Sequence, residues 1–523
     1  MSYNEQPQQT AGSKIWKGFA TIVFIAQAAA SAILFVKAFM LGMIPDKYLY
    51  GLGIVLWLLL MINALMLFVG SKRPVTGGKV LRRFIAVILA MCICFGSVLA
   101  YQAIDRVKAA LGEVTTQVSS DDTPVAMMNL YVLATDPAKT VADCKGYTVG
   151  IAAGNDSRNS KAALNKMSAE TGTPVQSKEY GSEGELISAL YGGEAKAIII
   201  SSTQAEILSE TEEYQGFVDK ARMVREYEIT NADLAFIPAD PNASEGNSGS
   251  INDNNAVNGD ITKTPFILYI SGSDTRNKQF KTSRSDVNIL MVVNPNTKQI
   301  LLVNTPRDYY IPNPKSSKGE RDKLTHLGLY GVGCSMKGLG DLYGCTVNYS
   351  VQINFTGLQT LVDQIGGVTI NNPQAFTAEN GIKFQKGTIT LNGEQALAYA
   401  RERHAFSSGD NMRGQNQMRI ITAMVNKVTS NKSQILKNYA GIMSALSGMF
   451  KTSVPTSDIE KLVKMQLNDM SQWKISSYAV TGKNGSEKTY TSPGHKAYVM
   501  WPNEDTVSEG SEKIKKVLAG GTL

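Results

Sequence analysis

The sequence predicts an α/β protein in three parts: three N-terminal transmembrane helices, a small extracytoplasmic α/β accessory domain and a larger α/β domain. Three observations support this prediction. Three long apolar stretches occupy the first hundred residues of the 523-residue chain. Short apolar runs then alternate with helical patterns, which is typical of βαβ units. Further along, acids and arginines flank three closely spaced β-branched runs.

The apolar stretches Gly18–Val36, Leu52–Gly70 and Phe84–Tyr101 each approach the roughly 20 residues that a helix needs to cross a bilayer. We expect residues 1–13 to form a disordered cytoplasmic tail and 14–104 to hold the three helices. No small-residue cleavage site clearly ends the first stretch, and two more stretches follow it, so we expect an uncleaved span rather than a signal peptide.

The distribution of basic residues predicts how the chain crosses the membrane. Lys72, Arg73, Lys79, Arg82 and Arg83 lie between the second and third stretches. The first loop offers Lys37 and Lys47 against Asp46. The positive-inside rule therefore places the N-terminus in the cytoplasm and everything after residue 104 outside. We therefore predict a multi-pass cell-membrane protein. The formal net charge is +7, but the sequence has no basic tracts interleaved with aromatic residues, so we predict that the protein binds no nucleic acid.

We expect residues 105–142 to be a connector and 143–237 to form the accessory domain. The predicted strands are 148–154, 175–180, 197–202 and 223–229, with helices over 156–171, 182–194 and 203–218. The pattern weakly resembles one lobe of a periplasmic solute-binding protein. A glycine after the first strand suits either an anion site or a turn, and the turn is the commoner use. Residues 238–263, rich in Gly, Asn, Ser and Asp, are predicted to be a flexible linker.

The larger domain is organised around the runs Ile267–Ile270, Val287–Val293 and Gln299–Val303, each short enough for a buried strand. Polar residues stand at the strand ends: Asp274 after the first, Arg284 and Asp286 before the second, Arg307 and Asp308 after the third. Because ligands of open α/β sheets collect at strand ends, this pattern predicts a metal and phosphate site. Surface salt bridges are the alternative interpretation.

A second group of polar residues follows a predicted helix over 393–400. Arg401 and Arg403 point to one side if the chain is extended there. Asp410, Arg413 and Gln417 share one face of a predicted helix over 411–429. Asp410 also suits a plain helix N-cap, and the other two suit solvated positions. Five arginines without a matching surplus of carboxylates would repel one another, so we predict that they bind an anion, most simply a diphosphate.

These residues fall in motifs that resemble the LytR-CpsA-Psr family of cell-wall ligases. The motifs are G-S-D at 272–274, R-S-D at 284–286, P-R-D at 306–308, D-K-L-T-H at 322–326, G-G-V at 366–368, G-E at 393–394 leading to R-E-R at 401–403, and D-x-x-R-x-x-x-Q at 410–417. The resemblance covers residues 264 to about 518, within a predicted domain of 264–521. Two positions depart from the family pattern: Asn416, often arginine, and Asn304-Thr305, usually serine-isoleucine.

The resemblance implies an α/β/α sandwich with an apolar tunnel for a polyprenyl tail. It also implies Mg²⁺ on Asp274 and Asp286. The implied activity transfers a glycopolymer, such as teichoic acid or a capsule-like polysaccharide, from undecaprenyl diphosphate to peptidoglycan. The implied diphosphate-binding residues are Arg284, Arg307, Arg401, Arg403, Arg413 and Gln417.

We assign catalytic roles to Asp410 as base toward the acceptor hydroxyl, to Arg413 as its charge partner and to Arg307. His326 and His404 lie near motif residues, although a single histidine is more often structural. Two other functions fit the same residues: a polyprenyl-phosphate-binding sensor or transcriptional attenuator without turnover, and a lipid-diphosphate hydrolase. Cys334 and Cys345, predicted to lie outside the cell, permit a disulfide.

Overall fold

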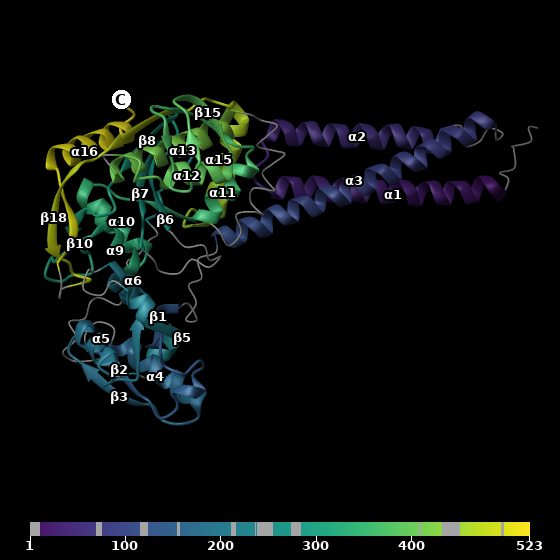
Figure 1. Ribbon diagram of the computed structural model, residues 1–523. Helices are drawn as coiled ribbons and strands as arrows, with labels where there is room; N and C mark the ends of the chain where they lie inside the picture. The colour runs from purple at the N-terminus through teal and green to yellow at the C-terminus, as the bar shows by residue number, and fades with distance from the viewer. Residues whose placement is uncertain are drawn as a thin grey trace, which may run out of the picture.

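The structure is a computed structural model that describes residues 11–69, 76–115, 124–153, 157–210, 216–235, 237, 255–273, 284–406, 409–430, 450–492 and 496–523. Figure 1 shows three parts: a long helical bundle, a large α/β domain at one end of it, and a small α/β domain beside the large one. Most of the predicted tail, residues 1–10, and most of the predicted linker, residues 238–254, lie outside the described residues.

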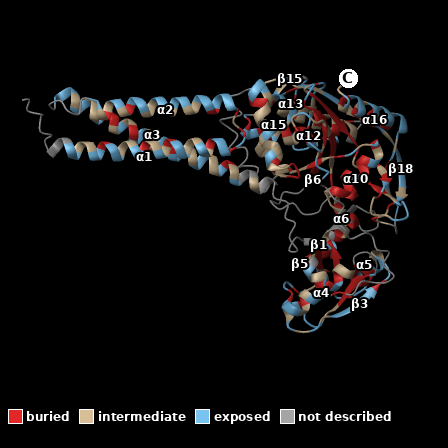
Figure 2. Cartoon of the chain, turned by 180° about the vertical axis from the view of Figure 1, so that it is seen from behind, coloured by how far each residue is buried: buried red, intermediate tan, exposed pale blue. Residues whose placement is uncertain are grey.

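The bundle consists of α1 (Ala11–Met40), α2 (Asp46–Phe68) and α3 (Gly77–Thr115). Among the described residues, these three helices are long and apolar enough to cross a membrane. Their apolar side chains are largely exposed, as on a surface that faces lipid (Figure 2). Inside the bundle, the buried Asn63 amide donates a hydrogen bond to Gln27 Oε1. Such interhelical hydrogen bonds help to hold helices together where water is absent.

One end of the bundle packs against helix α15 (Thr456–Asp469) of the large domain. Leu41, Met43 and Val107 are buried there against Ile459 and Val463. Two polar contacts surround this apolar cluster. Lys464 Nζ lies 2.9 Å from Asp46 Oδ1, and Lys47 Nζ donates to the Asn468 carbonyl at 2.6 Å. Side-chain contacts, and not only the covalent connection of the chain, therefore hold the large domain against the bundle.

The accessory domain is a mixed sheet in the order β3-β2-β4-β1-β5 with helices on both faces. Its elements are β1 (Pro124–Leu133), β2 (Thr148–Ala152), α4 (Ser157–Thr171), β3 (Gln176–Tyr180), α5 (Glu183–Tyr191), β4 (Ala197–Ser201), α6 (Ser202–Glu210), α7 (Phe217–Lys220), β5 (Ala221–Thr230) and α8 (Asn231–Leu234).

The predicted connector 105–142 is wrong in part, because it contains the strand β1. β1 pairs antiparallel with both β4 and β5 and supplies buried residues to both faces of the sheet. A strand buried on both faces shows a continuous apolar run without alternation, so its sequence pattern does not separate it from a helix continuing from α3.

The large domain is built on a sheet whose described strands follow the order β16-β11-β6-β7-β8-β17. The strands are β6 (Phe266–Ser273), β7 (Val287–Asn294), β8 (Gln299–Asn304), β11 (Tyr349–Asn354), β16 (Phe450–Thr452) and β17 (Lys474–Ala479). The three predicted strands of the organising stretch are confirmed as β6, β7 and β8, and they lie side by side.

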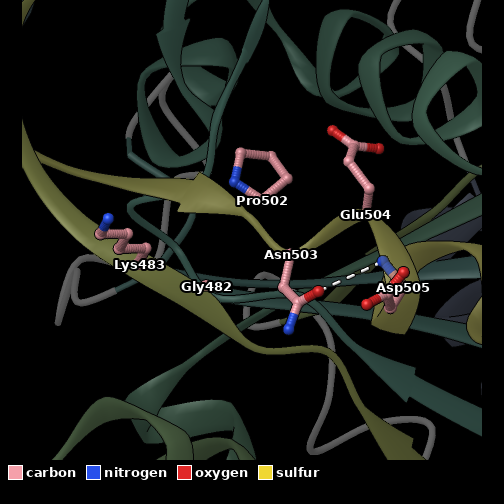
Figure 3. Close-up of a pocket in the computed structure, with 6 residues that line it drawn as sticks. All are labelled: Gly482, Lys483, Pro502, Asn503, Glu504 and Asp505. Carbon is pink, nitrogen blue, oxygen red and sulfur yellow. Dashed lines mark hydrogen bonds between the residues drawn. The ribbon is translucent and has the colours of Figure 1, made fainter.

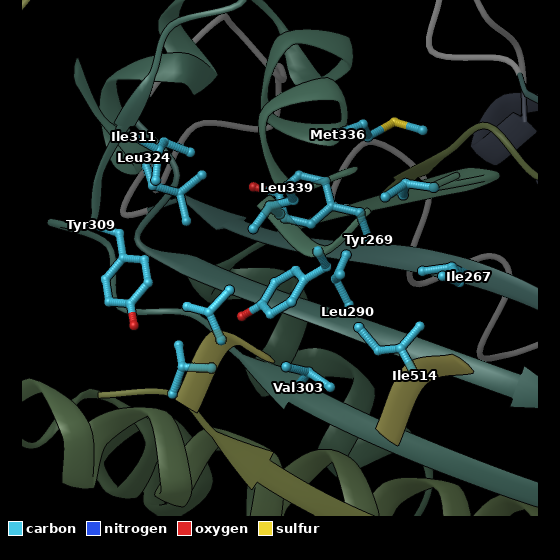
Figure 4. Close-up of a cluster of buried hydrophobic side chains, with 14 of the residues drawn as sticks. Ile267, Tyr269, Leu290, Val303, Tyr309, Ile311, Leu324, Met336, Leu339 and Ile514 are labelled. Atoms are coloured by element: carbon cyan, nitrogen blue, oxygen red, sulfur yellow. The ribbon is translucent and has the colours of Figure 1, made fainter. Parts of the chain in front are cut away.

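Alternate residues of these strands serve two separate cores, as the two-residue period of a strand requires. Tyr269, Leu290 and Val303 pack on one face against α10 (Val332–Tyr343) and α16 (Glu504–Leu518) (Figure 4). Ile289, Ile300 and Leu302 pack on the other face against α13 (Asp410–Ser430) and α15. The α/β/α sandwich is therefore confirmed. Ile261, within the predicted linker, is also buried in the second core.

The remaining elements surround the sheet. The helices are α9 (Leu324–Leu327), α11 (Phe355–Gln364) and α12 (Gly393–Arg401), and the paired strands are β9 (Tyr310–Pro312) with β10 (Arg321–Lys323), β12 (Val368–Asn372) with β15 (Gly387–Leu391), β13 (Phe376–Thr377) with β14 (Lys383–Phe384), and β18 (Gly482–Lys488) with β19 (Lys496–Pro502). The sequence prediction missed the β18–β19 hairpin, because the glycines and lysines of β18 are weak strand formers and left β19 without a predicted partner strand.

The disulfide that Cys334 and Cys345 permitted does not form, because both thiols are free in the structure. Cys334 lies in the first turn of α10 and Cys345 follows its end. A helix rises about 1.5 Å per residue, so α10 keeps the two Cα atoms roughly 13 Å apart, well beyond disulfide reach. Burial raises the pKa of Cys334 to about 12 and that of Cys345 to about 11.

The buried thiols lead to a prediction about alkylation. In the native protein at pH 8, Cys334 and Cys345 should react with iodoacetamide far more slowly than a free thiol, because neither forms thiolate readily. In urea without reductant, both should alkylate fully. Peptide mass spectrometry measures both reactions. If the peptides that contain Cys334 and Cys345 stayed unmodified in urea until reductant was added, the disulfide would exist.

The packing of the helical bundle against α15 leads to a second prediction. Met43→Asp places a charge in the buried apolar cluster and should loosen the docking of α15, with faster hydrogen exchange of residues 456–469 in detergent-solubilised protein. Lys464→Ala removes an exposed ion pair and should leave exchange nearly unchanged, since such pairs contribute about 0–1 kcal/mol. Equal effects of both variants, or no effect of Met43→Asp, would contradict this packing of the bundle against α15.

Candidate active site

The predicted site residues gather at one edge of the central sheet because of the strand directions. β11 runs parallel to β6, β17 runs parallel to β8, and β7 runs antiparallel between β6 and β8. The C-terminal ends of β6, β8, β11 and β17 therefore share an edge with the start of β7. The segments that carry Arg284–Asp286, Arg307–Asp308 and Phe355 all begin or end there.

The turn before β7, Arg284–Asp286, is anchored at its middle residue. The buried Ser285 hydroxyl lies 2.8 Å from both the Tyr269 hydroxyl and the Ser271 hydroxyl. The Ser285 amide donates to the Thr325 carbonyl at 3.2 Å, and the Asp286 amide donates to the Gly272 carbonyl at 2.8 Å. These bonds fix the backbone from which Arg284 and Asp286 project, and burial raises the pKa of Tyr269 so that its hydroxyl stays protonated.

Arg307 is the centre of an ion network that joins three segments. Its Nη1 lies 2.7 Å from Asp286 Oδ1, and its Nε lies 3.5 Å from Asp308 Oδ2. Lys323 Nζ lies 3.3 Å from Asp308 Oδ1. The Arg307 and Asp286 side chains are 16% and 17% exposed, so the pair is shielded from water and is positioned more firmly than a surface ion pair.

Lys323 belongs to this network, although sequence analysis gave it no role. The Lys323 side chain is 8% exposed. A lysine so deeply buried generally requires an acidic partner, and Asp308 provides it. Its position inside the D-K-L-T-H motif was the available signal.

Asp322 and His326 of the same motif have structural contacts. The His326 ring nitrogen Nδ1 lies 2.7 Å from Asp322 Oδ1, and both side chains are nearly fully buried. Asp322 Oδ2 also accepts hydrogen bonds from the Thr491 amide and hydroxyl and from Asn313. This network holds the 489–492 segment against β10, which favours the structural interpretation of His326.

Arg401, the last residue of α12, has its guanidinium carbon 4.3 Å from the centroid of the Phe355 ring. Phe355 is the first residue of α11, directly after β11. A cation over an aromatic face is held in place by the ring quadrupole. Phe355, which the sequence gave no reason to select, thus fixes Arg401 beside the sheet edge.

Helix α13 lies close against the end of β8. A Cβ added to Gly414 would come within 2.2 Å of the Asn304 side chain, so only glycine permits this approach. The neighbouring Arg413 is thereby placed near the segment that follows β8. The helix begins at Asp410, one residue before the predicted start at 411, and the Asp410 side chain lies outside the described residues.

The two departures from the family pattern have structural explanations. Asn416 is buried, and its amide donates to the Tyr399 carbonyl while its Oδ1 accepts from Arg419. The Thr305 hydroxyl lies 2.8 Å from the Tyr343 hydroxyl inside the core. Gln417 likewise donates to the Ala400 carbonyl at 3.3 Å. These amides join the end of α12 to the first turns of α13.

Of the predicted site residues, Arg307 and Asp286 form the ion network, whereas Arg403 has a different described contact. Arg403 is exposed, and its Nε donates to His404 Nε2 at 3.1 Å, while the buried Glu402 between Arg401 and Arg403 binds the amides of Glu379 and Ala405. Asp274 lies outside the described residues.

A pocket of about 420 Å³ opens at the base of the β18–β19 hairpin and includes none of the predicted site residues (Figure 3). It is lined by Gly482, Lys483, Pro502, Asn503, Glu504 and Asp505.

The described residues fit a magnesium ion in a limited way. No cluster of three His, Cys, Asp or Glu side chains occurs among them. Mg²⁺ is often held by one or two carboxylates together with substrate phosphates and water, so a full protein cage is not required. Asp286 presents one carboxylate oxygen to Arg307 and stands at the sheet edge, which suits a ligand of this kind.

The fold and this edge define a class: an α/β sandwich on a helical bundle, with guanidinium groups and carboxylates at the sheet edge where ligands of open α/β sheets bind. Comparison with known proteins identifies the family. Residues 238–509 match the LytR_cpsA_psr family, and the chain belongs to it.

Named relatives support this assignment. The chain is 36% identical over 202 residues to the polyisoprenyl-teichoic acid–peptidoglycan teichoic acid transferase TagU of Enterococcus faecalis, covering 38% of this chain and 65% of the relative, which is less than two thirds of its length. It is 32% identical over 261 residues to TagU of Bacillus subtilis, covering 49% of this chain and 79% of that protein.

Solved structures also match. The crystal structure of B. subtilis TagU is 28% identical, with a TM-score of 0.38, over 49% of this chain and 97% of that one. A structure of TagT bound to LIIa-WTA is 26% identical, with a TM-score of 0.40, over 50% of this chain and 94% of that one.

The ion network predicts the effect of changing Asp286. Asp286→Asn keeps the shape of the side chain but removes the charge that faces Arg307, and should lower the free energy of unfolding by about 1–3 kcal/mol. Asp341→Asn is the control, because the Asp341 side chain is 59% exposed and pairs with Lys337 on the surface. Urea unfolding followed by circular dichroism measures both variants. An Asp286 variant as stable as the Asp341 variant would contradict the network.

Proposed function

We propose that this chain is a phosphotransferase that moves a teichoic acid or capsule-like glycopolymer from a polyisoprenyl diphosphate, such as undecaprenyl diphosphate, to peptidoglycan at the outer face of the membrane. Family membership supports the proposal, and so do the TagU names of the relatives. The observation that carries it is the ion network of Arg307, together with Arg401 held on Phe355, at one edge of the sheet.

The proposed reaction is a phosphoryl transfer. An acceptor hydroxyl of peptidoglycan attacks the phosphorus next to the sugar, and a new P–O bond forms. The P–O bond to the lipid-side phosphate breaks, and polyisoprenyl monophosphate leaves. The proton of the hydroxyl passes to a base, for which Asp410 remains the candidate, with Arg413 beside it.

The basic side chains stabilise the charge that develops on both phosphates. Arg307 is already oriented by Asp286 and Asp308, so little reorganisation is needed when the diphosphate arrives. Arg284, Arg401, Arg403, Arg413 and Gln417 are proposed to complete the binding of the diphosphate. Mg²⁺ is proposed to be held by Asp274 and Asp286, and when bound it neutralises phosphate charge.

Activity of the full-length chain in phospholipid vesicles tests the proposal. With a labelled polyisoprenyl diphosphate–glycan and purified peptidoglycan, label should enter the insoluble peptidoglycan and polyisoprenyl monophosphate should form. Arg307→Lys should lower the rate about 10²-fold or more, since a lysine cannot reproduce the fork of charge-assisted contacts.

Arg225→Lys is the matched control, because Arg225 lies on the accessory domain with a half-exposed side chain. It should retain full activity. Label released as soluble glycan at the same rate with and without peptidoglycan would identify a hydrolase and contradict the transferase. Binding of the labelled donor without any product would identify a sensor.

A further inference from the structure

The β18–β19 hairpin is joined directly to the candidate site. The Met500 amide donates to the Asp308 carbonyl at 2.7 Å, and Tyr309 and Met500 form a parallel bridge. The Tyr490 amide donates to the Arg321 carbonyl at 2.9 Å, one residue before Asp322. The hairpin therefore extends the surface that carries the Arg307 network.

The hairpin also lies far from the membrane helices. In Figure 1 and in the opposite view of Figure 2, β18 stands at the end of the large domain opposite to the bundle. Helices that cross a bilayer tilt on average by about 20° from its normal, so with the bundle in the membrane this end of the domain points away from the bilayer. A membrane surface is therefore a poor partner for the hairpin, whereas a polymer outside the membrane is a suitable one.

A built aromatic platform occupies the base of the hairpin. The Trp501 and Tyr310 rings meet edge to face, with centroids 4.8 Å apart and planes at 81°. The Arg321 guanidinium carbon lies 5.4 Å from the Trp501 ring centroid, and Arg321 Nη1 donates to the Tyr310 carbonyl at 2.8 Å. The Tyr310 hydroxyl donates to the Lys488 carbonyl at 2.6 Å. The aromatic and guanidinium groups are thus fixed by one another.

Gly485 shapes this platform from the opposite strand. A Cβ at Gly485 would come within 2.8–2.9 Å of the Trp501 indole, so the ring lies directly over the glycine backbone. Although it is held on several sides, Trp501 remains 37% exposed. The exposed part of the indole therefore presents a flat apolar face to solvent.

We propose that Trp501, with Tyr310 and Arg321 beside it, forms a docking platform for the glycan strand of the peptidoglycan acceptor. The C–H faces of sugar rings stack on an exposed indole, and Arg321 and Lys483 offer cations to the carboxylates of the polymer. The pocket beside Lys483 and Pro502 adjoins the same surface (Figure 3). The proposal rests on the proposed function, because it names where that reaction holds its acceptor.

Two measurements on the full-length chain in detergent test the platform. The first is cosedimentation with purified, insoluble peptidoglycan. Trp501→Ala should weaken binding about three- to tenfold, the range expected for one aromatic contact. Trp501→Phe should recover most of the binding. Gly485→Ala, which displaces the indole without removing it, should also weaken binding.

The matched control is Tyr191→Ala. Tyr191 is also 37% exposed and has Lys220 over its ring at 5.5 Å, but it lies on the accessory domain. It should bind peptidoglycan normally. Each variant is accepted only with a wild-type melting curve, and Trp501→Phe provides a second reading if Trp501→Ala is unstable.

The second measurement is the transfer reaction. Trp501→Ala should raise KM for peptidoglycan by a similar factor and leave KM for the lipid diphosphate donor unchanged. Unchanged cosedimentation, or equal losses in Trp501→Ala and Tyr191→Ala, would overturn the platform. So would a change in oligomeric state without a change in glycan binding, since the surface would then belong to a second copy. If the wild type transfers nothing, the proposed function fails, while cosedimentation still tests the platform.

Discussion

The ion pair between Arg307 and Asp286 is the interaction on which the rest of the large domain's site depends. It joins the segment after β8 to the turn before β7, and Asp308 and Lys323 extend it to β10. Charges held at such low exposure are costly without partners, so each group constrains the others. The core below the site also holds the ion pair in place, because the Tyr269 hydroxyl on β6 contacts the Ser285 hydroxyl and fixes the turn that carries Asp286. A diphosphate would meet cations that are already oriented.

The parts of the fold with strong sequence patterns were predictable. The apolar helices, the strands β6 to β8 and the helix that begins at Asp410 follow from hydrophobic period and length alone. The grouping of Arg307 with Asp286 was also predictable in outline, because strand ends in such sheets share an edge.

Other features depend on tertiary structure and left no local signal. β1 is buried on both faces, so its continuous apolar run lacks the alternation of a half-buried strand. The contact of Phe355 with Arg401 joins residues 46 positions apart by their numbers. Gly414 matters because of Asn304, and Asn416 because of Tyr399, and no pattern within α13 indicates either partner. The spacing of Cys334 and Cys345 permitted a disulfide until the helix between them was known.

The central claim is that the sheet edge is arranged in advance for a diphosphate rather than for a single phosphate. Calorimetric titration of the full-length chain in detergent with a polyisoprenyl diphosphate and with the matching monophosphate tests it most directly. We expect the diphosphate to bind at least about tenfold more tightly, and Arg307→Lys to remove most of that preference, since each charge-assisted contact contributes about 1.5–3 kcal/mol. Equal affinities for the two lipids in the wild type, or a preference that survives Arg307→Lys, would contradict this account.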